Sequence, residues 1–239
     1  MLLVSCTVFL YCCLTAVAAE TGIEAVHENG DPLKIRRGYY RDLIMVLQWP
    51  PGLCYQTWCR AAPQRWTIHG LWPNSPQDCY ESSGARHGCK LNFRRQHAGN
   101  LLGMMERKWP SLKGWSYEEF WEHEYCKHGT CCDDILTGPT AYFKGTLELF
   151  DSIVWKLWAA NITPSNDRTY EFDDVERALS FRPKYWCRQV GDKQILYQLG
   201  VSVRKSFDFT DGNNRHSRCR TYKPFYLLTG LQVDNVEQE

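Results

Sequence analysis

The sequence predicts a single α+β domain with a central antiparallel sheet, flanked by several helices and held together by disulfide bridges. Strand-like segments stand toward both ends of the chain, and helical periodicity fills its middle. No alternation of strands with helices is present that would build a parallel sheet. The chain has 239 residues, which suits one full-sized domain, and it contains 12 cysteines.

Apolar, β-prone segments mark the strands, and each ends at proline, glycine or turn residues. We expect strands within residues 38–50, 66–72, 195–210 and 225–233. The third of these segments alternates with period two, and Asp211-Gly212 follows it as a turn.

Helical periodicity is present in four segments between the first and last strands. They are residues 91–109, 116–128, 140–160 and 172–181. Ser116 is followed three residues later by Glu119, which is the pattern of a capping box, so the second helix is expected to begin there.

The composition is that of a globular protein, with 44% hydrophobic and 23% charged residues. The absence of a Gly-X-Y period, of a sustained heptad and of more than one long apolar stretch excludes collagens, coiled coils and multispan membrane proteins. The net charge is +1, so the chain has no general attraction for nucleic acids or anionic membranes. Any polyanion must therefore be bound at a local site.

Residues 1–18 are expected to form a secretory signal peptide, because they are apolar and end in Ala16-Val17-Ala18, the small-x-small form of a signal peptidase site. The alternative is a signal anchor, since the stretch reaches the lower limit of a membrane span and no basic residue precedes it. Residues 19–38 are polar and unpatterned, which indicates a loose arm. The folded domain is expected at residues 39–239.

Removal of the signal peptide takes away Cys6, Cys12 and Cys13 and leaves nine cysteines. In an oxidising compartment, nine cysteines allow up to four disulfides and one odd thiol. Zinc binding by the cluster from Cys126 to Cys132 is the alternative. The cluster contains no C-x2-C pair, however, and the export signal favours bridges.

Four ionisable side chains share one face of the helix expected at residues 116–128. At about 100° per residue they span an arc of about 140°. The four are His123, Glu124, Lys127 and His128. Tyr125 and Cys126 fall outside this arc and are available for packing or bridging. A solvated face would explain Glu and Lys alone, but two histidines beside Phe120 and Trp121 favour a cleft.

The spacing of these histidines does not suit a metal, so no metal and no cofactor are expected. A zincin H-E-x-x-H motif places its histidines about 40° apart, whereas His123 and His128 are about 140° apart. Two histidines with pKa values near ~6.5 can remove and donate protons at one pH, and Lys127 can stabilise a developing oxyanion. A phosphodiester with a neighbouring 2′-OH suits this chemistry, and RNA has that hydroxyl whereas DNA does not.

The strings WTIHGLWP at residues 66–73 and FWEHEYCKHGTC at residues 120–131 resemble the two active-site segments of the T2-type ribonucleases, which are secreted or lysosomal acid endoribonucleases. The similarity extends from about Tyr39 to Val233. It includes Q-W-P-x-x-x-C from Gln48 to Cys54, Trp109-Pro110, and a Y-F-x-x-x-L-x-L helix at Tyr142.

The resemblance implies a monomeric endoribonuclease, outside the cell or in lysosomes. It would cleave single-stranded RNA without a metal, through a 2′,3′-cyclic phosphate and with weak base specificity. DNA would not be cleaved, and no membrane would be bound after signal cleavage. The alternative is a secreted binding or signalling protein on the same fold that does not depend on catalysis. Both active-site histidines are present, which favours the enzyme.

Carried over residue by residue, the resemblance implies His128 as the general base on the 2′-OH and His69 as the general acid on the departing 5′ oxygen. It implies His123 as a phosphate ligand. Glu124 and Lys127 would stabilise the pentacoordinate transition state, and Glu124 could also orient or tune a histidine.

Base binding is implied for the aromatic residues after the first motif, Trp72 and Tyr80, by stacking that tolerates every base. The alternatives are core packing for Trp72 and a loop position for Tyr80. Asn74 stands where some members carry an acidic residue, so the resemblance implies no adenine preference from this position. Gln48, in the Q-W-P opening, is also assigned to substrate binding.

The resemblance further implies the disulfides Cys54–Cys59, Cys187–Cys219 and Cys131–Cys79, with Cys131–Cys89 as the alternative to the last. Three cysteines then have no assigned partner, Cys126 and Cys132 among them. Asn161 begins the only N-glycosylation sequon, and Pro164 directly after it disfavours modification. Tyr125 replaces the usual tryptophan, on the side of the helix away from the ionisable arc.

Overall fold

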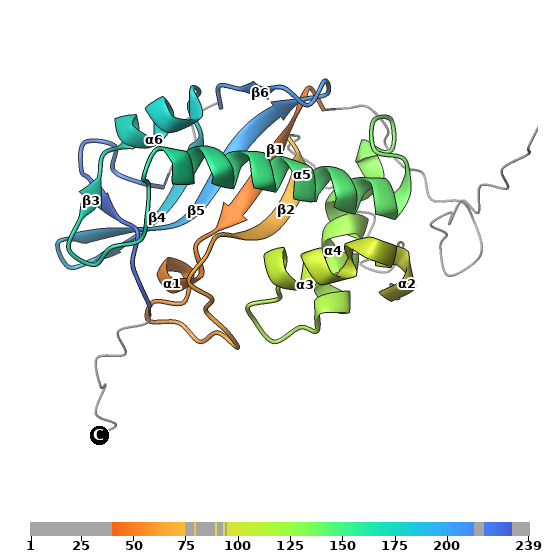
Figure 1. The fold of residues 1–239 in the computed structure, drawn as a ribbon, viewed down its shortest axis with the longest axis horizontal. Coiled ribbons are helices and arrows are strands. Elements are labelled where there is room, and N and C mark those ends of the chain that lie inside the picture. The colour runs from red at the N-terminus through yellow and green to blue at the C-terminus, as the bar shows by residue number, and fades with distance from the viewer. Residues whose placement is uncertain are drawn as a thin grey trace, which may run out of the picture.

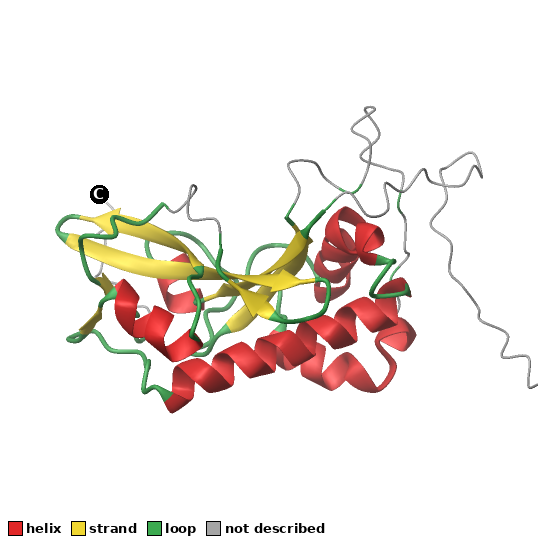
Figure 2. Ribbon diagram, turned by 90° about the horizontal axis from the view of Figure 1, so that it is seen from above, coloured by secondary structure: helices red, strands yellow, loops and turns green. Residues whose placement is uncertain are grey.

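The computed structural model describes residues 40–74, 79, 89, 93, 95–212 and 218–230. A seven-stranded sheet forms the centre of the molecule (Figure 1). One long helix runs along a face of this sheet, and shorter helices gather at one end of it (Figure 1, Figure 2). The expected signal peptide and arm lie outside the described residues, as does Tyr80.

The sheet is centred on β5, which pairs with four other strands. The strands are β1 (Asp42–Gln48), β2 (Thr67–Pro73), β3 (Thr169–Tyr170), β4 (Lys184–Val190), β5 (Lys193–Arg204), β6 (Phe209–Thr210) and β7 (Phe225–Tyr226). β1, β4 and β6 pair with β5 in antiparallel fashion, β2 extends the sheet beyond β1, and β3 pairs with β7. The predicted α+β class is confirmed, with β5–β7 as a single parallel pair.

The strand expected at residues 195–210 is in fact a hairpin of β5 and β6. Phe207 adopts a left-handed backbone conformation, with φ 66°, and the amide of Arg204 donates to the carbonyl of Asp208 at 2.8 Å. These two features reverse the chain before the expected turn at Asp211-Gly212. Strand β4 was not expected, although it makes the longest pairing with β5 besides β1.

Three of the four expected helices form close to their expected ends. The helices are α1 (Pro50–Leu53), α2 (Arg95–Ala98), η1 (Gly99–Leu101), α3 (Leu102–Lys108), α4 (Tyr117–His128), η2 (Gly129–Cys132), α5 (Gly138–Ala159) and α6 (Phe172–Leu179). The exception is the segment 91–109, in which α2, η1 and α3 replace one continuous helix. Gly99 has φ +52°, a left-handed conformation that interrupts the regular helical hydrogen bonds.

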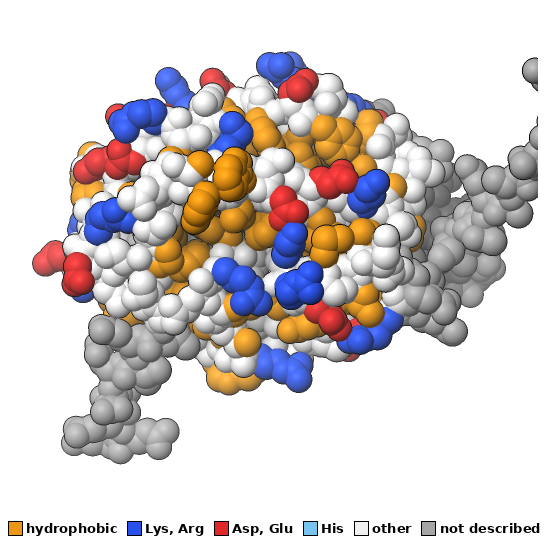
Figure 3. Space-filling view, viewed as in Figure 1, with side chains coloured by type: hydrophobic (Ala, Val, Ile, Leu, Met, Phe, Trp, Pro, Cys, Tyr) orange, Lys and Arg blue, Asp and Glu red, His pale blue; other side chains and the backbone are white. Residues whose placement is uncertain are grey.

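Helix α5 provides the apolar layer that covers the sheet. Its buried residues Phe143, Leu147, Phe150, Ile153 and Leu157 recur three or four positions apart along one stripe. Its opposite side is exposed. On the face of the molecule that carries this helix, basic and acidic side chains are interspersed and no patch of one sign dominates (Figure 3).

Four disulfides hold the described chain. They are Cys54–Cys59, Cys79–Cys131, Cys89–Cys126 and Cys187–Cys219. Three of these are the pairs that the resemblance implies, with Cys79 rather than Cys89 as the partner of Cys131. The fourth gives Cys126 the partner that had not been assigned. Cys132 is the free, buried thiol, and the zinc alternative fails because Cys126 and Cys131 are bridged.

None of the helices in the described ranges combines the length and apolar character that a membrane crossing needs. The interior is instead rich in aromatic residues. Trp49, Trp109, Trp121, Tyr142 and Phe143 are fully buried or nearly so. The three buried indole N–H groups each donate to a backbone carbonyl, so their polar atoms are satisfied inside the core.

Candidate active site

His69 occupies a β-bulge in strand β2. In the β1–β2 pairing, Val46 lies opposite Gly70 and Leu47 lies opposite Ile68, which leaves His69 as the extra residue without a partner in β1. A bulge bends its strand and redirects the side chain at that position. The 29% exposed side chain of His69 therefore reaches the cluster on α4 described below, although its strand neighbours Ile68 and Gly70 are buried.

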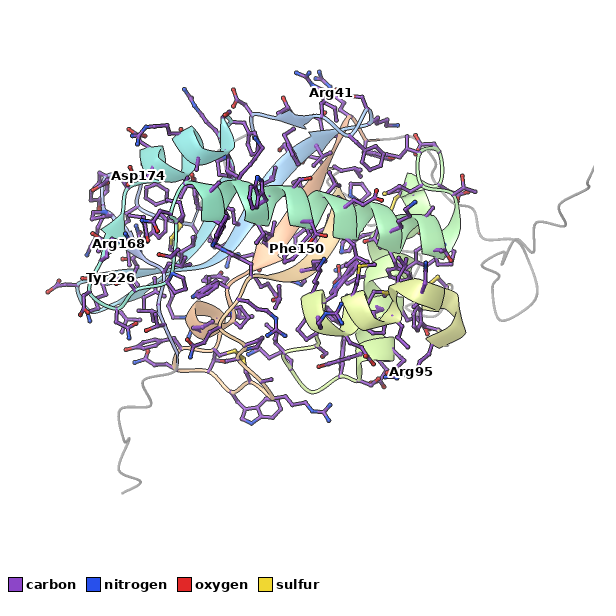
Figure 4. The ribbon with its side chains drawn as sticks, viewed as in Figure 1. Arg41, Arg95, Phe150, Arg168, Asp174 and Tyr226 are labelled. Atoms are coloured by element: carbon purple, nitrogen blue, oxygen red, sulfur yellow. A yellow bond between two sulfur atoms is a disulfide. The ribbon has the colours of Figure 1, made fainter. Side chains whose placement is uncertain are left out.

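Helix α4 begins with the capping box expected from the sequence. The Ser116 side chain accepts a hydrogen bond from the amide of Glu119, and the Glu119 carboxylate accepts from the amide of Ser116. At the same end, Arg95 donates to Glu118 of α4 at 2.8 Å and to Glu106 of α3 at 2.7 Å (Figure 4). Cap and ion pairs fix the helix that carries the other site residues.

Two buried tryptophans connect α4 to the bulge. The indole N–H of Trp121 on α4 donates to the carbonyl of Trp109 at 2.8 Å, and the indole N–H of Trp109 donates to the carbonyl of His69 at 2.9 Å. Because these donors have no access to water, breaking either bond leaves an unsatisfied polar group in the core. The relative position of β2 and α4 is therefore set by hydrogen bonds as well as by packing.

Glu124 is the buried centre of the site, with 2% of its side chain exposed. Its Oε2 accepts a hydrogen bond of 2.8 Å from the indole of Trp72, and its Oε1 lies 3.9 Å from Nε2 of His69. Gly70 makes room for this arrangement, because a Cβ there would lie 2.0 Å from Glu124 Oε2 and 2.5 Å from Trp72 Nε1. Glu124 thus contacts Trp72 and lies close to both Gly70 and His69, so a change in one of these residues affects the others.

The second proton-transfer candidate, His128, is the last residue of α4. The Trp72 ring lies 5.2 Å from the His128 ring and 4.8 Å from the His69 ring, measured between centroids. Trp72 thus stands beside both imidazoles and is half-buried, so core packing alone does not describe its position. The Trp72 indole therefore joins the segment 66–73, to which it belongs, to His128 of the segment 120–131.

The environment shifts the pKa values of all three central groups. Burial raises the pKa of Glu124 to about 8, against the opposing influence of Trp72 and Lys127. Burial lowers the pKa of His128, and the charges of Lys127, His69 and His123 lower it further. Burial also lowers the pKa of His69. In the absence of an anion, the site therefore favours a neutral carboxyl and neutral imidazoles.

His123 and Lys127 belong to the same electrostatic cluster. Both lower the pKa of His69 and of His128 through their charges. The His123 ring packs edge-on against Trp115, 4.8 Å away between centroids, at the exposed rim before α4. The arc predicted from helical geometry is thus realised, and Tyr125 and Cys126 on the other side of α4 are buried.

The other sequence candidates lie at the edge of this cluster or outside it. Gln48 is 7% exposed in β1, opposite Thr67 of β2 and Gln198 of β5. Asn74 is exposed immediately after β2, where its backbone N–H donates to the backbone carbonyl of Asp42 at 2.7 Å. Sequence reasoning missed Gln198, whose Oε1 lies 3.2 Å from Nδ1 of His69. No motif marks this residue, and only the fold brings it to the site.

Comparisons with known proteins identify the family of the chain. The sequence model of the Ribonuclease T2 family matches residues 40–219. Ribonuclease T2 of Danio rerio is 33% identical over 185 residues, which cover 72% of this chain and 72% of that protein. Extracellular ribonuclease LE of Solanum lycopersicum is 33% identical over 66% of this chain and 74% of its own.

The solved structures give the same result. RNase NT in complex with 5′-AMP superposes with a TM-score of 0.64 at 28% identity, over 79% of this chain and 98% of that one. The SF11-RNase of Nicotiana alata, at 24% identity and a TM-score of 0.63 over 80% and 100% of the two chains, shares the fold. By class, the chain is an endoribonuclease. It belongs to the Ribonuclease T2 family.

Proposed function

We propose that the chain cleaves single-stranded RNA without a metal, by transphosphorylation to a 2′,3′-cyclic phosphate. The observation that carries the proposal is the pair of imidazoles of His69 and His128 beside the same indole, with the buried carboxyl of Glu124 3.9 Å from His69. Two imidazoles in one site can take and give protons in a single step. The substrate supplies the nucleophile, because the 2′-OH is adjacent to the phosphorus.

In the first step, His128 removes the proton of the 2′-OH and His69 protonates the departing 5′ oxygen. The lowered pKa of His128 keeps it neutral and ready to accept a proton. His69 must be protonated to act as the acid, although burial lowers its pKa. The negative charge of the bound phosphodiester raises this pKa again. In the second step, the roles exchange, and water opens the cyclic phosphate.

Glu124, Lys127 and His123 stabilise the negative charge of the transition state in this proposal. Since burial raises the pKa of Glu124, its carboxyl is protonated at acidic pH and does not repel the phosphate. It can then donate a hydrogen bond to a phosphoryl oxygen. Lys127 and His123 add positive charge from the same helix.

Base recognition is weak in this proposal. The half-buried ring of Trp72 offers part of its surface to a base, and stacking accepts every base at roughly 1–3 kcal/mol. Tyr80 is proposed as a second stacking residue from the sequence alone. Asn74 is exposed nearby and can contact a base edge without the charge of an acidic residue. Gln48 has little exposed surface, which makes it a support for the site more than a contact.

We further propose that the chain is a monomer that is exported, to the extracellular space or to lysosomes. The apolar segment at residues 1–18 and four disulfides support an oxidising destination. Asn161 is exposed directly after the end of α5, where an N-glycan could be attached. A mass decrease on treatment with a peptide N-glycosidase tests this modification.

Digestion of one single-stranded RNA in EDTA tests the activity, with product analysis by mass spectrometry. The same sequence as DNA and as 2′-O-methyl RNA provides two controls that lack the nucleophile. We expect 2′,3′-cyclic phosphate ends from RNA alone. Cleavage of either control, or loss of RNA cleavage in EDTA, would overturn the mechanism.

A further inference from the structure

One buried amide contacts the catalytic cluster from outside both motifs. Gln198 of β5 is 7% exposed, and its Oε1 lies 3.2 Å from Nδ1 of His69. Since β1 separates β5 from β2 in the sheet, this contact crosses an intervening strand. In a regular β2, a side chain would neighbour residues of β1 and would not contact β5 in this way.

Two irregularities of the sheet lie at the two ends of this hydrogen bond. His69 is the extra residue of the β1–β2 pairing. In the β4–β5 pairing, Trp186 lies opposite Gln198 and Cys187 opposite Leu196, so that Tyr197, directly before Gln198, is the extra residue. Bulges redirect side chains next to active sites. Here the bulge at Tyr197 directly precedes Gln198, and the bulge in β2 contains His69 itself.

The contact has a defined chemical consequence for His69. An amide oxygen accepts, so Nδ1 carries the proton that is donated to Gln198, and Nε2 faces Glu124. The charged and titratable groups that face His69 come from α4, and they are Glu124, His123, Lys127 and His128. On the side of the sheet, the partner of His69 is Gln198. Its amide carries no charge, unlike a carboxylate in the same position.

We propose that Gln198 is a positioning residue that holds the His69 ring and fixes its proton on Nδ1, so that Nε2 is the nitrogen that delivers a proton to the leaving oxygen. This inference rests on the proposed role of His69 as general acid. The amide favours the protonated imidazole by accepting its hydrogen bond, and it does so without the strong pKa increase that a carboxylate would cause.

The test compares the pH dependence of kcat and of KM for three variants of the full chain. Gln198→Leu removes the acceptor, and we expect kcat to fall about 10- to 100-fold with KM unchanged, while the basic limb of the profile moves to lower pH. Gln198→Glu should move that limb to higher pH by about one unit or more. Both shifts follow from the stability of the protonated His69.

Gln194→Leu is the matched control. Gln194 is a fully buried glutamine of the same strand, and its amide bonds to Arg220 and Lys223 rather than to the site. Its loss should lower the melting temperature and leave the basic limb in place. An equal shift of the limb in Gln194→Leu would overturn the role of Gln198, because it would trace the effect to general loosening of β5.

Nitrogen NMR of the wild-type protein with 15N-labelled histidine tests the tautomer without a variant at Gln198. At a pH above the basic limb we expect a protonated Nδ1 and an unprotonated Nε2 for His69, assigned by their absence in His69→Ala. The reverse tautomer would overturn the inference. An active wild type with an unchanged profile in Gln198→Leu would overturn only this inference, whereas an inactive wild type would overturn the proposed function as well.

Discussion

Gly70 has a steric role at the centre of the site. A Cβ at this position would lie 2.0 Å from Glu124 Oε2 and 2.5 Å from Trp72 Nε1, so Gly70→Ala must displace the carboxyl, the indole or both. We expect turnover to fall at least about 10-fold, and the fold to lose about 1–3 kcal/mol through overpacking. Steady-state kinetics and thermal melts measure the two effects.

Gly103 provides the control for this substitution. A Cβ at Gly103 in α3 would have only Arg107 Nη1 nearby, at 3.5 Å. Gly103→Ala should therefore keep full turnover and stabilise the helix by about 0.5–1 kcal/mol. Equal activity of both variants would show that the contact at Gly70 does not matter for the reaction.

The two imidazoles should be far more sensitive to substitution than their supports. His69→Ala and His128→Ala each remove a group proposed to transfer a proton, which typically contributes 10²–10⁴-fold. Lys127→Ala removes only the proposed electrostatic support and should lose less. Tyr125→Ala should instead lower the melting temperature, because Tyr125 is buried against Tyr142 on the other side of α4. Near wild-type turnover of His128→Ala on RNA would refute the mechanism.

At the scale of elements, two disulfides constrain the C-terminal end of α4. Cys126, two residues before His128, pairs with Cys89, and Cys131, three residues after it, pairs with Cys79. Both bridges hold His128, the proposed general base, close to the segment that follows β2. The C-terminal end of α4 is thus constrained covalently, whereas its beginning is fixed by the cap at Ser116.

Removal of the Cys89–Cys126 bridge should destabilise the fold strongly. In the chain-entropy account, a closed loop of 37 residues contributes roughly 3–4 kcal/mol. The Cys54–Cys59 bridge closes only 5 residues and should contribute about 2 kcal/mol. Denaturant unfolding of the two double-serine variants measures both values, and a larger loss for Cys54–Cys59 would contradict this ranking.

The sequence was informative where local rules decide the structure. The capping box, the apolar stripe of α5 and the arc of α4 depend on positions three or four residues apart, and the structure shows them as expected. The bulge at His69, strand β4 and the contact of Gln198 depend on pairing between distant segments, which no local pattern records. The interrupted helix at residues 91–109 depends on one backbone conformation, that of Gly99, which the apolar periodicity conceals.

At the scale of the whole molecule, the shifted pKa values couple folding to pH. Burial raises the pKa of Glu124 from 4.5 to about 8, so between these values the folded protein binds a proton that the unfolded chain releases. This effect lowers stability as the pH rises through that window. The pKa of His69 falls from 6.5 to about 4, and that of His128 also falls. These two lower stability as the pH falls below 6.5.

The sum predicts maximal stability near pH 6.5 for these three groups. Below pH 6.5, the loss of stability from His69 and His128 exceeds the gain from Glu124. Above pH 6.5, the titration of Glu124 determines how stability changes with pH. We expect the free energy of unfolding to fall from pH 6.5 to 8 in the wild type and to change less in Glu124→Gln. Denaturant titrations at pH 5, 6.5 and 8 measure this difference. Identical slopes for both proteins would show that Glu124 ionises in the folded state as it does in water.

The bulge at His69 places a reactive residue where the ladder does not need one. Ile68 and Gly70 already lie opposite consecutive residues of β1, Leu47 and Val46. Deleting His69 would therefore bring the two strands into continuous antiparallel register and would remove the proposed proton donor in the same event. A single lost codon would make the sheet more regular, but it would also remove the carbonyl that accepts from the buried Trp109 indole. The irregularity of the sheet therefore serves the site and the core together.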